Sequence, residues 1–569
     1  MNRILRRACI GATAGLVASP ILVLTIGQAA ASLGRGVALA LLVAPCFVAL
    51  RRPAARATID ALMEAAAFGV PLWALNSVVL LPMLDGEPRR WTAAAMQEVF
   101  PALVGWMLFM ATLGVLAHAI DGYVTRRWGS EATPPEPVLP TPTRILILGG
   151  GFAGVSTAER LENLFGASPA VELTLVSETN ALLFTPMLAE VAASSLEATH
   201  ITSPLRTGLR RTTVVRGSAV AIDLANRCVR VERSAGAGQE LEYDHLVLAL
   251  GAVSNYLGMK GVEAHAFDFK SLADAIRIRN HVIDCFERAD VEQDADERRR
   301  LLTFVIAGGG FAGAELTGGL NDFARGMLPY YPNIPRKELQ VVLVHGGERI
   351  LNELSEPLAL YAQRSMAGRG VTLRLGTRLK DATADRVVLS DGEVASRTLV
   401  WTAGTAPNPL LKTLATQAGV ELDKRGAVVT EQTMLVKGQS NVWALGDAAA
   451  IPNPKTGMNC PPTAQFAIRE ARQLAFNLRA ALQGKAPRPF RFSPLGALCV
   501  VGHHTACAEI KGLRFSGLFA WFMWRTIYLS KLPSLERKVR VMGDWLVEIF
   551  FPRDIVQTID LDGKERKTP

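Results

Sequence analysis

The stretch that decides the fold is Arg144-Ile-Leu-Ile-Leu-Gly-Gly-Gly-Phe-Ala-Gly154. Its aliphatic run, Ile145 to Leu148, is typical of a buried parallel strand, and the residues that follow from Ser156 are typical of a helix. Between them stands Gly149-x-Gly151-x-x-Gly154. The first glycine permits a tight turn, the second lets the backbone approach a pyrophosphate, and the third allows close helix–strand packing. The stretch therefore predicts a dinucleotide-binding turn, with phosphates at the start of the helix.

A near copy of this stretch occurs at Thr303-Phe-Val-Ile-Ala-Gly-Gly-Gly-Phe-Ala-Gly313, with Gly308, Gly310 and Gly313 in the same spacing. One glycine-rich turn after a strand can be purely structural, but a repeated fingerprint argues for two nucleotide sites. The sequence predicts an α/β fold with two Rossmann-like dinucleotide-binding domains.

The strand after each fingerprint should end in a carboxylate that binds a ribose hydroxyl. In the first unit the strand is Val171–Glu178, and Glu178 is the candidate, although Ser177 stands at the more usual position. In the second unit the strand ends in His345, so no carboxylate repels a 2′-phosphate, and Arg349 could assist NADPH. Both NADH and NADPH therefore remain open as donors.

A later strand, Asn441-Val-Trp-Ala-Leu, leads into Gly446-Asp447. A carboxylate at this position could bond a polyol hydroxyl of a flavin. The alternative interpretation, an Asp that caps a helix, is physically compatible with that role.

The N-terminal region differs in character from the rest of the chain. The 569 residues are 49% hydrophobic and carry a net charge of +9. Basic residues flank apolar runs, which favours an anionic lipid surface over nucleic acid. Each apolar run approaches the ~20 residues that span a bilayer. The four runs are Ala8–Ala31, Leu33–Leu50, Ala61–Leu84 and Val99–Ile120.

Arginines set the expected orientation of these runs. With four spans, the residues before the first, after the second and after the fourth lie on one side, which the positive-inside rule makes cytoplasmic. Arg89 and Arg90 argue weakly against this arrangement. We expect a multi-pass protein of the cell membrane, with its catalytic part in the cytoplasm. The supporting arginines are Arg3, Arg6, Arg7, Arg51, Arg52, Arg56, Arg126 and Arg127.

Several stretches give the chain a family resemblance: Thr179-Asn-Ala-Leu-Leu-Phe-Thr-Pro-Met-Leu188, Pro461-Pro-Thr-Ala-Gln-Phe-Ala467 and Phe519-Ala-Trp-Phe-Met-Trp-Arg-Thr-Ile-Tyr-Leu-Ser-Lys531. Together with the two fingerprints, they resemble the type II NADH:quinone oxidoreductases, also called alternative NADH dehydrogenases. The resemblance covers roughly residues 143–560 and leaves out the N-terminal apolar region, which that family usually lacks.

The resemblance implies FAD as cofactor and NADH, or alternatively NADPH, as electron donor. It also implies hydride transfer to the flavin and transfer of two electrons to a membrane quinone of the respiratory chain, without proton pumping. It assigns Glu315 to the nicotinamide–flavin side and Gln465 to the quinone side as catalytic residues. Arg469 stands where a second glutamine is common. The implied cofactor contacts are Gly149, Gly151, Phe152, Ala153, Gly154, Glu178, Gly446, Asp447, Ala464 and Gln465 for FAD, and Gly308, Gly310, Gly313 and Glu315 for NAD(P)H.

The cysteines bear on the electron acceptor. The chain has 7 cysteines, and none forms a C-x-x-C motif. Related disulfide reductases carry a cysteine pair after the first fingerprint's helix, whereas Leu182 to Met187 contains none. Electrons should therefore pass directly to a diffusible acceptor. Two alternatives remain: a sulfide:quinone oxidoreductase, for which Cys460 lacks an evident partner, and a membrane-anchored flavin redox sensor.

We expect an all-α transmembrane region of about four helices (1–128), a proline-rich linker (129–142), and the FAD domain in two parts (143–264 and 399–485). The NAD(P)H domain (265–398) lies between those parts. A C-terminal segment (486–569), with Arg525 and Lys531 among aromatic residues, is expected to associate with the membrane. A packed core helix is the alternative for its aromatic part. The expected partners are a membrane quinone, the lipid bilayer and, as an open alternative, a second copy in a homodimer; no nucleic acid is expected.

Overall fold

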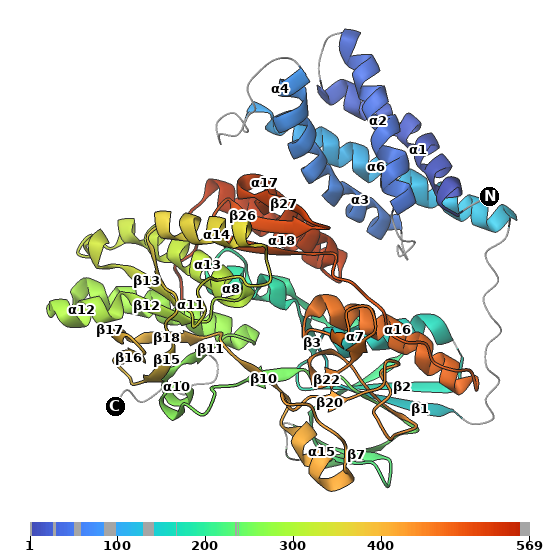
Figure 1. The fold of residues 1–569 in the computed structure, drawn as a ribbon. Coiled ribbons are helices and arrows are strands. Elements are labelled where there is room, and N and C mark those ends of the chain that lie inside the picture. The colour runs from blue at the N-terminus through green and yellow to red at the C-terminus, as the bar shows by residue number, and fades with distance from the viewer. Residues whose placement is uncertain are drawn as a thin grey trace. The chain divides into compact units, whose positions relative to one another are not determined.

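The computed structural model describes residues 3–26, 30–50, 58–84, 98–128, 142–166, 168–233, 236 and 238–557. The chain forms two compact units, which Figure 1 shows with the labels used below. The α/β unit consists of Pro135–Ser516 and Arg540–Pro569, and the helical unit of Met1–Pro134 and Gly517–Val539.

The first nucleotide domain of the α/β unit is built on a five-stranded parallel sheet in the order β21-β9-β1-β2-β5. Ile145 to Leu148 of the central strand are at most 1% exposed, as expected for a strand covered on both faces. The helix after the first fingerprint, α7, packs against α16. The bounds are β1 (Thr143–Leu148), β2 (Val171–Ser177), β5 (Thr212–Arg216), β9 (His245–Leu248), β21 (Val442–Ala444), α7 (Phe152–Phe165) and α16 (Ala464–Leu482).

The second nucleotide domain repeats this design in a parallel sheet of order β11-β18-β12-β13-β14. Its central strand again runs into the fingerprint helix, α13. Helix α11 begins at a capping box formed by Ser271 and Asp274, which fixes its start. The bounds are β11 (Phe267–Asp268), β12 (Thr303–Ala307), β13 (Gln340–Val344), β14 (Val371–Arg374), β18 (Thr398–Trp401), α11 (Leu272–Val291) and α13 (Phe311–Met327).

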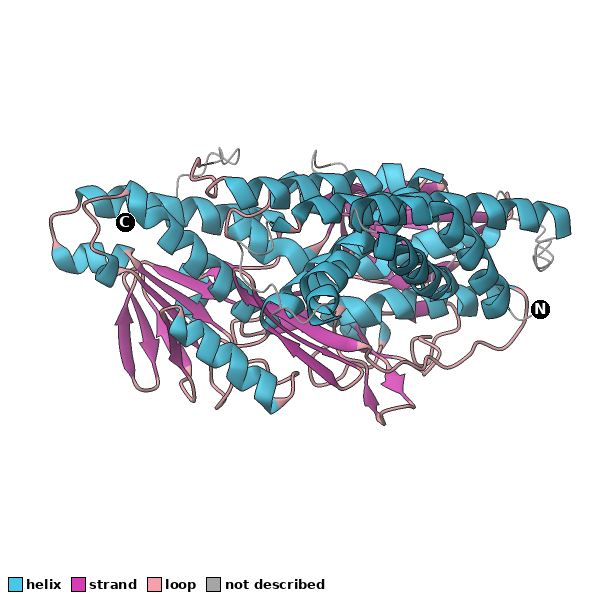
Figure 2. Ribbon diagram, turned by 90° about the horizontal axis from the view of Figure 1, so that it is seen from above, coloured by secondary structure: helices cyan, strands magenta, loops and turns pink. Residues whose placement is uncertain are grey.

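Short antiparallel elements connect and extend the two domains. Strands β10 (Ala252–Ser254) and β19 (Thr405–Pro407) pair where the chain leaves the first domain and returns to it. Figure 2 shows the strands in separate groups among the helices. The three-stranded sheets are β6 (Ser218–Asp223), β7 (Cys228–Glu232) and β8 (Gly238–Glu242); β15 (Leu379–Ala382), β16 (Arg386–Leu389) and β17 (Gly392–Ala395); and β25 (Gly496–Gly502), β26 (Thr505–Ile510) and β27 (Leu513–Ser516).

The remaining elements of the α/β unit are β3 (Ala181–Leu183), η2 (Thr185–Met187), α8 (Leu188–Ala192), η3 (Ala198–Ile201), β4 (Thr202–Pro204), α9 (Leu205–Gly208), α10 (Lys260–His265), α12 (Ala295–Leu301), η4 (Leu328–Tyr330), η5 (Arg336–Glu338), α14 (Glu356–Gly368), α15 (Leu410–Ala418), β20 (Val428–Val429), η6 (Gly446–Ala448), β22 (Ala449–Ala450), β23 (Pro452–Asn453) and β24 (Met458–Asn459).

The helical unit contains a helix at each of the four predicted apolar segments. Two stretches, Ala61–Met83 and Phe100–Val124, are long and apolar enough to cross a membrane, whereas Arg7–Val23 and Val37–Ala49 are shorter. Arg51, Arg52, Arg56, Arg89, Arg90 and linker residues 129–141 lie outside the described residues. The bounds are α1 (Arg3–Ile26), α2 (Ala30–Leu50), α3 (Thr58–Trp73), the π-helix η1 (Ala74–Leu80), α4 (Leu81–Leu84) and α6 (Phe100–Trp128).

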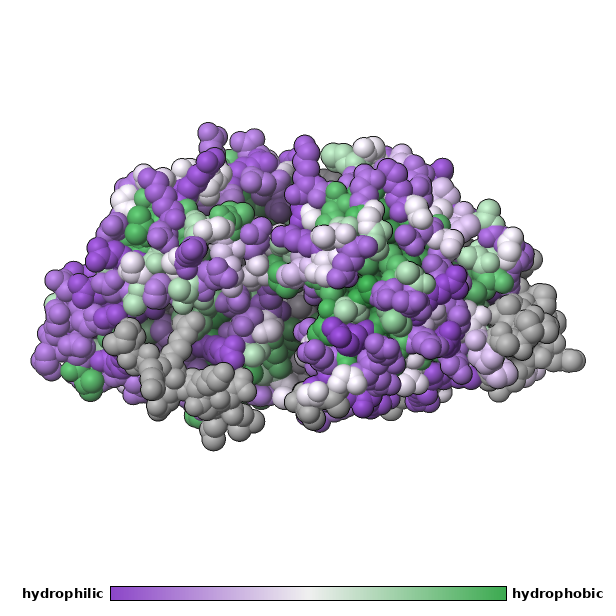
Figure 3. All heavy atoms as spheres, turned by 90° about the horizontal axis from the view of Figure 1, so that it is seen from below, coloured by the Kyte–Doolittle hydropathy of each residue, from purple (hydrophilic) through white to green (hydrophobic). Residues whose placement is uncertain are grey.

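The C-terminal segment is divided between the two units. Strands β25–β27 form a sheet of the α/β unit, whereas α17 (Gly517–Lys531) packs on α3 in the helical unit. There the rings of Phe522 and Trp73 meet edge-on, with their centroids 6.2 Å apart. Helix α18 (Leu535–Phe550) exposes Leu546, Val547 and Phe550 while burying Trp545. By contrast, hydrophilic residues cover most of the face drawn in Figure 3.

Candidate active site

The first glycine-rich turn joins β1 to α7 with the predicted geometry. Gly149 has φ of +115°, and a Cβ there would overlap the carbonyl oxygen of Ala249. A Cβ on Gly154 would overlap the carbonyl oxygen of Gly149. A Cβ on Gly151 would meet nothing within 4 Å, and Gly151 caps α7 without a side-chain hydrogen bond. The first N–H groups of α7 thus remain available for an anionic phosphate.

The Gly446-Asp447 pair lies beside this turn. Gly446 has φ of +68°, and a Cβ there would lie 3.1 Å from Cβ of Ala153. Burial raises the pKa of Asp447, and the positive charges of Lys270 and Arg425 oppose that rise. Lys270 is itself partly buried, which lowers its pKa, and its ammonium donates to the carbonyl oxygen of Ala252 at 3.0 Å. The structure thus places Gly446 beside Ala153 of the first fingerprint, and Lys270 is a neighbour that sequence reasoning missed.

A second carboxylate, Glu470 of α16, lies under Gly446. It is 1% exposed and accepts the Gly446 N–H at 2.9 Å. Burial raises its pKa to about 7, against the opposing effect of hydrogen bonds from Gly446 and the Cys460 thiol. Sequence reasoning missed Glu470, although a carboxylate four residues after Phe466 on the apolar face of a helix was the available signal.

The two candidates for ribose binding at the end of β2 lie in different environments. Ser177 is buried beneath the glycine turn, where a Cβ on Gly150 would overlap its Oγ. Glu178 is exposed, and the Arg216 side chain reaches its carbonyl oxygen at 3.5 Å. A buried Ser177 cannot present itself to a ribose, whereas Glu178 can.

The second glycine turn reproduces the first. Gly308 has φ of +120°, and a Cβ on Gly313 would overlap the carbonyl oxygen of Gly308. The Thr402 hydroxyl donates to the carbonyl oxygen of Ala307 at 2.8 Å and secures the turn. Gly310 caps α13 without a side-chain hydrogen bond, and a Cβ there would meet nothing within 4 Å. This turn therefore offers a second open phosphate cradle.

His345 takes the place in the second domain that Ser177 takes in the first. Its ring lies beneath Gly309 and accepts that residue's backbone N–H through Nδ1 at 3.2 Å, which requires a neutral ring nitrogen. Burial lowers the pKa of His345. Gly346 is exposed at the position that corresponds to Glu178, and a Cβ on it would lie 3.4 Å from Cγ of Arg378. Arg349 donates to Asn352 at 3.3 Å.

The two predicted catalytic residues bind the same strand, β25. Gln465 donates from Nε2 to the carbonyl oxygen of Gly496 at 3.2 Å and accepts the Leu495 N–H through Oε1 at 2.9 Å. Glu315 of α13 accepts the Val500 N–H at 3.3 Å. Ala464, next to Gln465, is the first residue of α16. Sequence reasoning did not identify β25 as the element that joins the two residues.

The Arg469 side chain is held by two contacts at this site. Its guanidinium lies 4.5 Å from the centroid of the Phe492 ring, and it donates to the carbonyl oxygen of Gln465 at 2.9 Å. Phe152, within the first turn, packs edge-on against Phe184 at 5.7 Å.

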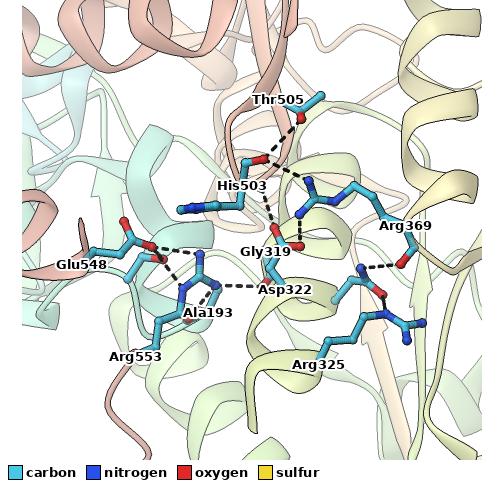
Figure 4. A network of polar contacts seen from close by, with 11 residues as sticks. Ala193, Gly319, Asp322, Arg325, Arg369, His503, Thr505, Glu548 and Arg553 are labelled. Carbon is cyan, nitrogen blue, oxygen red and sulfur yellow. Dashed lines mark hydrogen bonds and ion pairs between the residues drawn. The ribbon is translucent and has the colours of Figure 1, made fainter. Parts of the chain in front are cut away.

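A polar network fixes the distal half of α13 and the C-terminal tail (Figure 4). Arg553 donates to the Glu548 carboxylate at 3.0 Å and to the carbonyl oxygens of Ala193 and Gly319 at 3.2 and 3.3 Å. Asp322, one helical turn further along α13, pairs with Arg369 and accepts the His503 N–H. These contacts line a groove of about 340 Å³.

The geometry fits two nucleotides. Each fingerprint leaves the start of its helix open to a pyrophosphate. Beside the first fingerprint, the carboxylates of the exposed Glu178 and the partly buried Asp447 can accept hydrogen bonds from ligand hydroxyl groups. Within the described parts of the chain, no group of three His, Cys, Asp or Glu residues could hold a metal ion. All seven cysteines are free thiols, and Cys460 contacts Glu470 rather than another sulfur.

Comparison with known proteins agrees with this geometry. Residues 143–471 match the pyridine nucleotide-disulphide oxidoreductase family, and residues 495–554 match the NDH2 C-terminal domain. A probable NADH dehydrogenase of Dictyostelium discoideum is 33% identical over 72% of this chain and 90% of that protein. The type II NADH:quinone oxidoreductase Ndh of Mycobacterium tuberculosis is 30% identical over 72% of this chain and 89% of that protein.

The fold also matches a solved structure, that of NDH2 from Plasmodium falciparum in complex with NADH. The TM-score is 0.67 at 18% identity, and the match covers 73% of this chain and 99% of that one.

Proposed function

The chain belongs to the type II NADH:quinone oxidoreductases, and we propose that its two fingerprints bind FAD and NADH so that two electrons reach a membrane quinone without proton pumping. The observation that carries this proposal is β25, which Glu315 binds from the second nucleotide domain and Gln465 from the first. One strand thus contacts a candidate catalytic residue from each nucleotide domain.

Specific residues fit each part of FAD. The open N–H groups after Gly151 suit the pyrophosphate, the exposed Glu178 suits a ribose hydroxyl, and Asp447 suits the polyol chain. The chemistry that bound FAD would supply is the uptake of a hydride from NADH and the release of two electrons to a quinone. Gly310 and the start of α13 suit the pyrophosphate of NADH.

Glu315 and Gln465 are proposed to act at the reacting end of the site. Glu315 lies near the start of α13, and its bond to Val500 fixes the orientation of the carboxylate that we place beside the nicotinamide. Gln465 uses Oε1 and one Nε2 hydrogen to hold β25, so its second Nε2 hydrogen is the group that can donate to a quinone carbonyl.

We place the enzyme at the cell membrane, multi-pass, with its α/β unit on the cytoplasmic side. The support is the pair of long apolar helices, the arginine distribution, and two features near the C-terminus. Helix α18 exposes an apolar face, and in α17 Arg525 lies 3.9 Å from the centroid of the Trp521 ring. Aromatic–basic pairs of this kind suit a membrane interface.

The test uses the full FAD-loaded chain in phospholipid vesicles with decylubiquinone. We expect NADH to be oxidised only when the quinone is present, and no acidification of the vesicle interior to accompany turnover. Flavin reduction by NADH without quinone turnover would overturn the proposal and favour a flavin redox sensor. Flavin reduction by sulfide would favour a sulfide:quinone oxidoreductase, a reaction for which Cys460 has no partner sulfur.

A further inference from the structure

A carboxyl group buried without a counter-ion supports the glycine turn that we assign to FAD. Glu470 of α16 is 1% exposed, and its Oε2 accepts the backbone N–H of Gly446 at 2.9 Å. Gly446 has φ of +68° and immediately precedes Asp447, the residue proposed to bind the polyol chain of FAD. Glu470 thus holds the backbone that presents Asp447.

The groups around Glu470 are hydrogen-bond donors and a second acid. The Cys460 thiol donates to its carboxylate, and Asp447 is the other titratable group that acts on it. Helix α7, which packs on α16, contributes no such group, and the adjacent Arg469 guanidinium is held 4.5 Å from the centroid of the Phe492 ring. Among the described residues, Glu470 therefore has no cationic partner.

The proton on Glu470 decides its charge but not its contact with the turn. Burial without a counter-ion favours the protonated form of a carboxyl group. The pKa of Glu470 is accordingly raised to about 7, so the group titrates close to neutral pH. In its neutral form the side chain still has a carbonyl oxygen for the Gly446 N–H. Protonation thus removes a negative charge and keeps the hydrogen bond.

The charge matters because Gly446 lies against the phosphate-binding end of α7. A Cβ on Gly446 would lie 3.1 Å from Cβ of Ala153, in the first turn of α7, and 3.8 Å from Cβ of Ala467 in α16. Glu470 is therefore packed, through Gly446, against the helix start proposed to bind the pyrophosphate of FAD. An ionised Glu470 repels that pyrophosphate across a low-dielectric interior, whereas a neutral Glu470 does not.

We propose that Glu470 is a positioning residue of the FAD site whose proton controls the affinity for FAD: the neutral side chain holds the Gly446–Asp447 turn and admits the anionic cofactor, and ionisation weakens its binding. This inference rests on the proposed function, because that function makes FAD the ligand of the first fingerprint. It gives α16 a role in cofactor retention in addition to the role proposed for Gln465.

The test measures the dissociation constant of FAD by equilibrium dialysis of the full FAD-loaded chain in buffers from pH 6 to pH 8. We expect the constant of the unmodified chain to rise about fivefold over this range, because proton loss from Glu470 opposes FAD binding. Glu470→Gln keeps the acceptor and cannot ionise, so its constant should vary less than about twofold. Glu431→Gln, at an exposed carboxylate of the α/β unit, should keep the pH dependence of the unmodified chain and serves as the matched control.

Cys460→Ala provides a second test if Glu470→Gln does not fold. It removes a donor that favours the ionised carboxylate, so the rise in the dissociation constant should move to higher pH. The thermal unfolding of each variant shows whether it is folded.

A dissociation constant that does not change with pH in the unmodified chain, or that changes equally in Glu470→Gln, overturns the inference. An unmoved pH profile in Cys460→Ala also counts against it. The measurement needs neither NADH nor quinone, so failure of the proposed electron transfer appears separately, as absent quinone turnover in a chain that retains FAD. A chain that retains no FAD overturns both proposals.

Discussion

Glu315 of α13 accepts a hydrogen bond from the backbone N–H of Val500 in β25 at 3.3 Å. Gln465 of α16 holds the start of the same strand through Leu495 and Gly496. Since α13 continues the second fingerprint and α16 packs on the helix of the first, β25 links the two nucleotide domains. A change at Glu315 should therefore separate the effect of its charge from the effect of its contact.

Glu315→Gln keeps an oxygen that can accept the Val500 N–H but removes the negative charge. We expect kcat with NADH and decylubiquinone to fall by about 100-fold, because the group proposed to lie beside the nicotinamide loses its negative charge, while FAD content stays unchanged. Stopped-flow absorbance at the flavin band will show whether flavin reduction or reoxidation is slowed. Turnover within twofold of the unmodified enzyme would contradict a catalytic role; Glu315→Ala, which loses both charge and contact, provides the comparison.

The parallel between Ser177 and His345 predicts how donor specificity can be changed. Both residues lie beneath a glycine turn, and the next position, Glu178 or Gly346, is exposed and is the one we propose to face the ribose. Gly346→Glu should lower kcat/KM for NADPH tenfold or more through charge repulsion with the 2′-phosphate and change that for NADH little. The neutral variant Gly346→Gln is the control. Equal losses with both nucleotides, or the same discrimination in the Gln variant, would refute the prediction.

The pKa of Glu470 predicts a pH-dependent stability. Burial raises this pKa from 4.5 to about 7, so the folded protein holds the proton more tightly than the unfolded chain. The resulting stabilisation is complete below pH 4.5 and is lost as the pH rises through about 7. Glu470→Gln is neutral throughout. Its stability relative to the unmodified protein should therefore increase by roughly 2.5 kcal/mol between pH 5 and pH 8. Urea unfolding at both pH values measures this difference, and parallel changes in the two proteins would exclude a shifted pKa.

Both glycine turns were predictable from sequence, because φ angles of +115° at Gly149 and +120° at Gly308 and the close contacts of Gly154 and Gly313 depend on local chain geometry. The direction of the Ser177 and His345 side chains was not predictable from sequence. It depends on which face of the strand's end packs against the neighbouring glycine turn.

Long-range partners were beyond sequence reasoning for a different reason. Glu470 and Lys270 reach Gly446 and Asp447 only through tertiary packing, and neither sits in a motif. Likewise, the aromatic pattern of the C-terminal segment predicted membrane association, with a packed core helix as the alternative, but could not show that Phe522 packs on Trp73, a residue near the other end of the chain.

Arg553 and Glu548 form an ion pair in the C-terminal tail, with side chains 17% and 8% exposed. Arg553 also satisfies the carbonyl oxygens of Ala193 and Gly319, and Glu548 accepts the Ser195 hydroxyl at 3.0 Å. Arg553→Met removes a counter-ion of a nearly buried carboxylate together with the hydrogen bonds that Arg553 donates, which should destabilise the fold by about 3 kcal/mol. Urea unfolding of the FAD-loaded protein measures the loss.

The double variant Glu548→Gln with Arg553→Met tests whether charge is the cause. Removing both charges should cost less than the sum of the two single changes, because no carboxylate then remains to lose its counter-ion. Lys437→Met provides the matched control, since Lys437 and Glu421 pair at 2.8 Å with both side chains 55% exposed. Solvent screens that pair, so its loss should shift the unfolding midpoint little. Strict additivity of the two changes at the tail would show that Arg553 acts through its backbone contacts alone.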